Sequence, residues 1–147
     1  DLDVGKLETA KKLGADLGLD PSKVDVPNAI REATGGRGAD LAFEAVGIAP
    51  TVQGAIASLR KGGSCTLVGN LAKTVDMPLQ EIVTRQLMLI GTCASAGEYP
   101  ACLDLIARGM IDVDCLISKV KPLEEGADWF ARLHKGNEGL TKVILTP

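Results

Sequence analysis

The stretch Asp40-Leu-Ala-Phe-Glu-Ala-Val-Gly47 decides the fold class, because only Glu44 interrupts its apolar run over residues 41–46. A run that does not alternate with polar residues is typical of a strand covered on both faces, as in a parallel sheet flanked by helices. Gly47 ends the predicted strand, and residues 50–59 follow as a predicted helix that is capped by residues 61–63. The stretch therefore predicts a strand–helix unit of an α/β domain.

The same alternation continues on both sides of this stretch. Further strands are predicted at 15–17, 64–68, 75–77, 87–91, 116–120 and 142–145. Further helices are predicted at 4–14, 27–34, 78–85, 100–110 and 123–134. Alternating strands and helices indicate a partial Rossmann-type, doubly wound parallel sheet. A helix follows Asp1 directly, so we interpret the chain as the later part of such a protein, without the first strand and phosphate loop.

Composition argues against two classes of partner. The 147 residues include 16 Lys and Arg against 19 Asp and Glu, for a net charge of -3, and only 3% are aromatic. Without a basic surface or stacking platforms, nucleic-acid binding is not expected. No apolar stretch approaches the roughly 18 residues of a membrane span, and the start lacks a signal-peptide pattern. We expect a cytoplasmic protein with no membrane contact.

The four cysteines are Cys65, Cys93, Cys102 and Cys115. Their spacing matches no zinc module. Cys65 and Cys93 fall in apolar, strand-like segments, so buried and reduced thiols are expected, as in a reducing compartment.

The ends of the predicted strands are the candidate binding surface. Ligands of open parallel sheets bind beyond the carboxyl ends of the strands, and small residues there let the backbone approach a flat ring or a ribose. The residues at these ends are Ala45, Val46, Gly47, Val68, Gly69, Asn70, Cys93, Ala94 and Ser95. A single glycine would be explained by strand termination alone, but small residues at successive strand ends favour a cofactor surface.

Asp1 is the most specific candidate in this surface. An acidic residue at the end of the second strand accepts hydrogen bonds from the adenosine ribose and repels a 2′-phosphate, which favours NAD over NADP. The alternative is that Asp1 caps the first helix, a role for which Asp3 competes.

Four other features have simpler interpretations. The segment Thr34-Gly-Gly-Arg-Gly38 follows a helix and precedes a strand, the reverse of a phosphate loop, so it is interpreted as a turn. His134 falls in the last turn of a helix without a partner set for catalysis, so it is not assigned a catalytic role. Glu44 is expected to make a structural hydrogen bond, and Trp129 and Phe130 are expected to pack in the core.

Four segments together resemble the zinc-dependent medium-chain alcohol and polyol dehydrogenases, such as sorbitol and threonine dehydrogenases. They are residues 1–15, 40–47 and 59–69 and the tail Gly139-Leu-Thr-Lys-Val-Ile-Leu145. The resemblance spans nearly the whole chain and corresponds to the C-terminal half of a family member. It implies an enzyme that transfers hydride between an alcohol or polyol and NAD, with zinc polarising the substrate alkoxide. The zinc ligands of the family have no counterpart in this chain, which is expected to be inactive alone and to hold no catalytic residue.

The resemblance also implies roles for individual residues. Asp1 and Lys6 would hold the adenosine ribose, and Lys142 would lie near the pyrophosphate. The ends of the strands at 45–47 and 68–70 would flank the cofactor, and the backbone of residues 93–95 would meet the nicotinamide carboxamide.

The resemblance further implies a domain boundary and an assembly. Residues 1–94 would belong to the NAD-binding domain, and residues 95–147 would return toward the catalytic domain. A homodimer or homotetramer would form through edge strands at 75–77 and 88–90.

Two alternatives stay open. One is a zinc-free, NADP-dependent quinone or enoyl reductase, against which Asp1 argues. The other is a standalone α/β regulatory module, which would need an acidic pocket where this chain has Ala45-Val46 and Val68-Gly69. The usual Arg-Tyr pair of polyol dehydrogenases is replaced by Ala94-Ser95, although Glu98-Tyr-Pro100 is polyol-like, so the substrate is left open.

Overall fold

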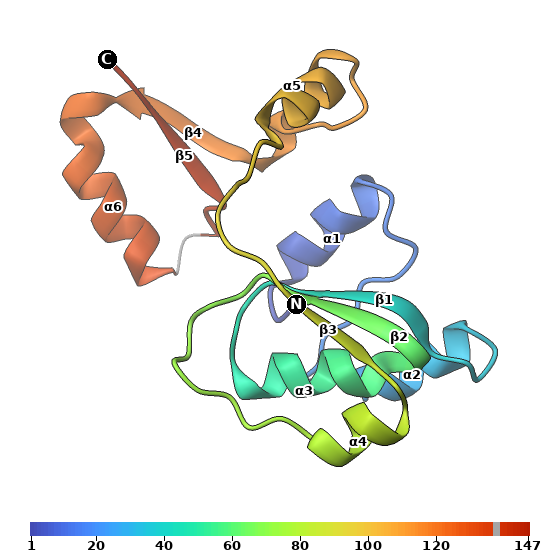
Figure 1. Cartoon of the computed structure of the whole chain (residues 1–147). Coiled ribbons are helices and arrows are strands. Elements are labelled where there is room, and N and C mark those ends of the chain that lie inside the picture. Colours follow the sequence, from blue (N-terminus) through green and yellow to red (C-terminus); the bar gives the residue numbers. More distant parts are fainter. Residues whose placement is uncertain (137–138) are drawn as a thin grey trace. The chain divides into compact units, whose positions relative to one another are not determined.

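The computed structural model describes residues 1–136 and 139–147, which form two compact units (Figure 1). The first unit comprises Asp1–Leu2 and Leu19–Ala94, and the second comprises Asp3–Gly18 and Ser95–Pro147.

The first unit is a parallel three-stranded sheet with its helices on one face (Figure 1). Its strands, in spatial order, are β1 (Ala39–Glu44), β2 (Leu59–Leu67) and β3 (Met88–Gly91). Its helices are α2 (Val26–Ala33), α3 (Ala49–Ser58) and α4 (Leu79–Thr84). Helix α3 connects β1 to β2 and packs against both strands and against α2. Consecutive parallel strands joined by helices confirm the predicted Rossmann-type architecture.

The core of this unit lies between α3 and the sheet. Ala42, Cys65 and Leu89 are register neighbours across the strands, and Cys65 and Ile56 are fully buried. The opposite face carries Leu41 and Phe43, whose side chains are 65% and 73% exposed. The prediction that the strand at residues 41–46 is covered on both faces is therefore wrong for the described residues. The apolar pattern is present on both faces of β1, but the helices of this unit cover only one.

Three local predictions also need correction. Residues 15–17 and 75–77 form no strand. In the second segment the carbonyl of Asp76 accepts a hydrogen bond from the Gln53 side chain, at 3.0 Å. Residues 61–63 are not a helix cap but part of β2, where Gly63 lies close to the Asp40 carbonyl of β1. Short apolar segments become strands only where a neighbouring strand pairs with them.

The second unit contains a parallel pair of strands, β4 (Ile117–Pro122) and β5 (Lys142–Thr146). Its helices are α1 (Val4–Lys12), α5 (Tyr99–Ala107), α6 (Gly126–Lys135) and the short 3₁₀ turns η1 (Asp114–Leu116) and η2 (Leu123–Glu125). Figure 1 shows α6 beside this strand pair. Asp3 caps α1 by accepting hydrogen bonds from the amides of Gly5 and Lys6.

The aromatic residues of α6 have different environments. Trp129 is buried, its indole N–H donates to Glu125 at 2.8 Å, and the Arg132 guanidinium lies 3.8 Å from the ring centroid. Phe130 is 72% exposed, so its predicted core position is wrong. Adjacent positions on a helix point in directions about 100° apart, and only Trp129 faces the interior.

All four cysteines are free, but only Cys65 is buried. Cys93, predicted to be buried, is exposed, and it lies two residues beyond the end of β3 at Gly91. Among the described residues, no helix has the length and apolar character needed to cross a membrane.

The turn before α2 makes an acid-sensitive contribution to stability. Asp20 accepts hydrogen bonds from the Ser22 hydroxyl and amide at 2.6 and 2.9 Å, and it pairs with Lys23 at 2.9 Å. These contacts, led by the Ser22 hydroxyl, lower the pKa of Asp20 from 3.8 to about 2. The ionised carboxylate therefore contributes stability above about pH 4, which is lost as the pH falls toward about 2.

We expect Asp20→Asn to flatten the pH dependence of the unfolding free energy between about pH 4 and pH 2. Urea unfolding of the wild type and the variant at several pH values measures this. Asp16→Asn, which changes an exposed carboxylate, is the control. Parallel wild-type and Asp20→Asn curves over this range would contradict the assignment.

Candidate functional site

The carboxyl ends of the three strands are tied together at one edge of the sheet. The carbonyl of Glu44, the last residue of β1, accepts hydrogen bonds from the amides of Val68 and Gly69 at 2.7 and 2.9 Å. The carbonyl of Leu67, at the end of β2, accepts from the amide and the hydroxyl of Thr92, both at 3.1 Å. The strand ends predicted as a candidate surface are thus joined by short backbone contacts.

Gly47 and Gly69 face each other directly at this edge. Gly47 has a φ of +83°, and a Cβ on it would overlap backbone atoms of Gly69 and Asn70. A Cβ on Gly69 would overlap backbone atoms of Val46 and Gly47. Glycine is required at both positions because two loops meet backbone to backbone, which sequence reasoning did not anticipate.

Glu44 holds the first of these loops from beneath. Its side chain is only 3% exposed, and its carboxylate accepts hydrogen bonds from the amides of Val46 and Gly47, both at 2.9 Å. Burial alone would raise the pKa of Glu44, but the hydrogen bonds from Gly47, Thr51 and Val46 outweigh it and leave the pKa below its usual value. The predicted structural hydrogen bond of Glu44 is confirmed. Burial and the nearby Glu44 charge raise the pKa of the Cys65 thiol.

Apolar side chains are exposed along the same edge. Val46 and Val68 are 46% and 52% exposed, although Val68 directly follows β2 and Val46 lies two residues beyond the end of β1. Beyond β3, Cys93 is exposed and Ala94 has a φ of 49°, a conformation that is uncommon without glycine. We use the name strand-end rim for Ala45, Val46, Gly47, Val68, Gly69, Asn70, Cys93 and Ala94.

The remaining predicted residues are distributed between the units. Asp1 belongs to the first unit, where its backbone nitrogen donates to the Leu19 carbonyl at 3.0 Å. Lys6, Ser95 and Lys142 belong to the second unit. The structure therefore brings the residues of the strand-end rim to one edge of the sheet. Of the other predicted residues, Asp1 lies in the first unit, and Lys6, Ser95 and Lys142 lie in the second.

Lys6 lines a cavity of about 530 Å³ inside the second unit. Cys115, Ser118 and Thr141 line the same cavity, and the Thr141 amide donates to the Ser118 hydroxyl at 2.8 Å. Thr141 precedes Lys142, so the structure places Lys6 beside the segment that leads into β5. Sequence reasoning missed Ser118 and Thr141, because nothing in their local pattern differs from ordinary surface hydroxyls.

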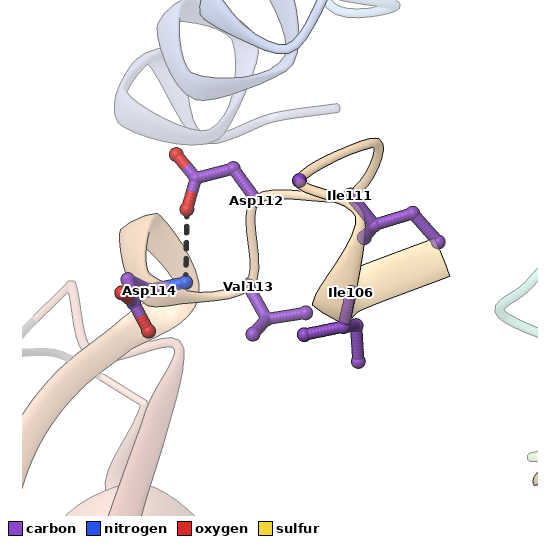
Figure 2. Close-up of a pocket in the computed structure, with 6 residues that line it drawn as sticks. Ile106, Ile111, Asp112, Val113 and Asp114 are labelled. Carbon is purple, nitrogen blue, oxygen red and sulfur yellow. Dashed lines mark hydrogen bonds between the residues drawn. The ribbon is translucent and has the colours of Figure 1, made fainter. Parts of the chain in front are cut away.

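A second, smaller pocket of about 320 Å³ lies after α5 (Figure 2). Figure 2 shows Ile106 and Ile111 at one end and Asp112 and Asp114 at the other. The Asp112 carboxylate accepts a hydrogen bond from the Asp114 amide at 3.0 Å. The predicted site includes none of these residues, and we assign them no binding role.

The described residues do not provide an evident metal centre. Nowhere in residues 1–136 and 139–147 do three or more His, Cys, Asp or Glu side chains gather as they would around a metal ion. His134 lies in the last turn of α6, as predicted, where a basic side chain interacts well with the helix dipole.

The contact between Gly47 and Gly69 can be tested by adding a methyl group. We expect Gly69→Ala to lower the unfolding free energy by about 2 kcal/mol, because the strand ends must move apart. Gly54→Ala is the matched control, since its Cβ would meet no atom within 4 Å inside α3. It should raise stability by up to about 1 kcal/mol. Equal stability of the two variants in urea unfolding would refute the contact.

Comparison with known proteins places the chain in a family. The profile of the family described as zinc-binding dehydrogenase matches residues 1–108. D-arabitol-phosphate dehydrogenase from Enterococcus avium is 36% identical over 92% of this chain and 39% of its own length. Sorbitol dehydrogenase from Bacillus subtilis is 31% identical over 100% of this chain and 42% of its own length.

Solved structures agree with this placement. The crystal structure of 2R,3R-butanediol dehydrogenase from Bacillus subtilis superimposes with a TM-score of 0.90 at 28% identity, covering 100% of this chain and 42% of that one. A zinc-binding dehydrogenase from Sinorhizobium meliloti, solved bound to NADP, gives a TM-score of 0.88 at 27% identity and covers 100% of this chain and 44% of that one. The chain spans about two fifths of the length of the curated relatives it matches. The chain belongs to the zinc-binding dehydrogenase family.

Proposed function

We propose that the protein carrying this chain is an alcohol or polyol dehydrogenase, which transfers hydride between its substrate and NAD. The role of the described residues is to bind the dinucleotide. The observation that carries the proposal is the strand-end rim, where a glycine-lined edge of a parallel sheet exposes Val46 and Val68. Ligands of such sheets bind at this edge, and exposed apolar side chains suit the faces of flat rings.

The proposed roles of single residues extend along the dinucleotide. Asp1 and Lys6 hold the adenosine ribose, and Lys142 lies near the pyrophosphate. The backbone of residues 93–95 meets the nicotinamide carboxamide. The cavity that Lys6 shares with Thr141 supports this assignment, because it associates Lys6 with the segment that precedes Lys142.

The substrate class is proposed from the relatives, whose names include dehydrogenases of arabitol phosphate, sorbitol and butanediol. When bound, zinc supplies the charge that stabilises a substrate alkoxide. The described part of this chain offers no cluster of ligands for it. We therefore assign these residues to the dinucleotide and not to the metal, and we expect the isolated chain to show no turnover.

Assembly and location are also proposals. The free edge of β3 (Met88–Gly91) suits strand pairing with a second copy, in a homodimer or homotetramer. Residues 75–77 form no strand, so β3 alone provides this edge within the described sheet. Four unpaired cysteines fit a reducing cytoplasm. We also propose that residues 1–94 belong to the NAD-binding domain and that residues 95–147 return toward the catalytic domain.

Cofactor choice tests the role of Asp1. In the full-length protein we expect NAD to bind more tightly than NADP. Asp1→Asn should weaken NAD binding by about tenfold or more, through loss of charge-assisted hydrogen bonds to the ribose. The same substitution should also reduce the preference for NAD over NADP, because the repulsion between the Asp1 carboxylate and a 2′-phosphate is removed.

Isothermal titration with both dinucleotides measures these affinities. Asp128→Asn, an equal charge change on α6, should leave both affinities unchanged. Tighter binding of NADP by the wild type would contradict the NAD assignment and favour the NADP-dependent reductase.

A further inference from the structure

Glu44 lies beneath the strand-end rim, and its contacts suggest more than a structural role. We propose that Glu44 is a positioning residue for the dinucleotide, because its carboxylate fixes the backbone of Val46 and Gly47 in the conformation that the cofactor meets. This inference rests on the proposed function of the rim.

One residue holds both strand ends. One carboxylate oxygen of Glu44 accepts the amides of Val46 and Gly47 at 2.9 Å, and the other oxygen lies 3.0 Å from the Gly47 amide. The Glu44 carbonyl accepts the amides of Val68 and Gly69, which begin the second loop of the rim. The side chain therefore holds the first loop, while the backbone of the same residue holds the second.

A carboxylate suits this position because of its hydrogen-bonding capacity. An ionised carboxylate only accepts hydrogen bonds, and the loop presents only N–H donors to it. A glutamine of the same shape keeps one acceptor oxygen, but its NH₂ group would lie against the Gly47 amide, donor facing donor, where the second carboxylate oxygen now accepts at 3.0 Å. Changing Glu44 to Gln therefore removes the charge and one of the two acceptor oxygens while the volume is kept.

Burial of the Glu44 carboxylate costs free energy unless the amides of the loop at residues 45–47 are held in place to donate hydrogen bonds to it. Glu44 is 3% exposed, and no salt bridge in the described part of the chain includes it. Its charge is balanced mainly by hydrogen bonds from the amides of Val46 and Gly47. The carboxylate is thus matched to the loop that follows the strand.

Replacement of one acceptor by a donor should move the loop. The NH₂ group of glutamine and the Gly47 N–H would repel each other, and Gly47 cannot shift toward Gly69 because their backbones are already in contact. Val46 would then leave its place in the strand-end rim, with a direct effect on the affinity for the cofactor.

The test compares Glu44→Gln with Ile56→Val in the full-length protein. Ile56 is fully buried in α3, so Ile56→Val weakens the core without touching the loop. Amide hydrogen exchange of residues 45–47, measured without cofactor, reports the order of the loop. NAD titration reports affinity, and the KM for NAD is compared with kcat.

We expect Glu44→Gln to speed amide exchange at residues 46–47 by about tenfold and to weaken NAD binding by about tenfold. The KM for NAD should rise while kcat at saturating NAD stays within about twofold, because uniform binding is lost. Ile56→Val should lower the unfolding midpoint and leave loop exchange and NAD affinity unchanged.

Other results would overturn the inference. Unchanged loop exchange in Glu44→Gln, or faster exchange with unchanged NAD affinity, would show that Glu44 does not position the cofactor. Equal losses of NAD affinity in both variants would show that the loss comes from general destabilisation of the fold and not from the loop. A wild-type protein that binds no nicotinamide dinucleotide would refute the proposed function of the rim, and with it the cofactor part of this inference. The exchange comparison would still decide whether Glu44 orders the loop.

Discussion

The structure of the first unit depends on the backbone contact between the ends of β1 and β2. Gly47 and Gly69 meet without side chains between them, and Glu44 supplies acceptors to the loops on both sides. Parallel strands bring their carboxyl ends to one edge, but their loops can meet this closely only where both carry glycine. This contact produces a narrow, glycine-lined edge, beside which the valine side chains at 46 and 68 are exposed.

Much of this arrangement could be predicted from the sequence. The apolar run before Gly47, the helix after it and the repeat of the same order predicted the parallel sheet, and the resemblance of four segments identified the family. The hydrogen bonds of Glu44 were also predictable in kind, because its side-chain partners lie only two and three residues along the chain. Local order of this sort is encoded in short segments.

The errors share a physical cause, which is that pairing and burial depend on distant residues. Residues 75–77 have a strand-like pattern but no strand beside them. Phe43 is apolar, yet no helix of its unit covers that face of the sheet. The contact of Gly69 with Gly47 joins positions 22 residues apart, so no local pattern could show it. The cavity beside Lys6 likewise combines α1 with the segments around residues 118 and 141.

The central claim is that the strand-end rim binds the dinucleotide. A crystal structure of the full-length protein with NAD would test it most directly. We expect the dinucleotide to lie across the carboxyl ends of β1, β2 and β3, in contact with Val46, Val68 and the backbone near Ala94. A dinucleotide bound elsewhere, with these strand ends bare, would contradict it.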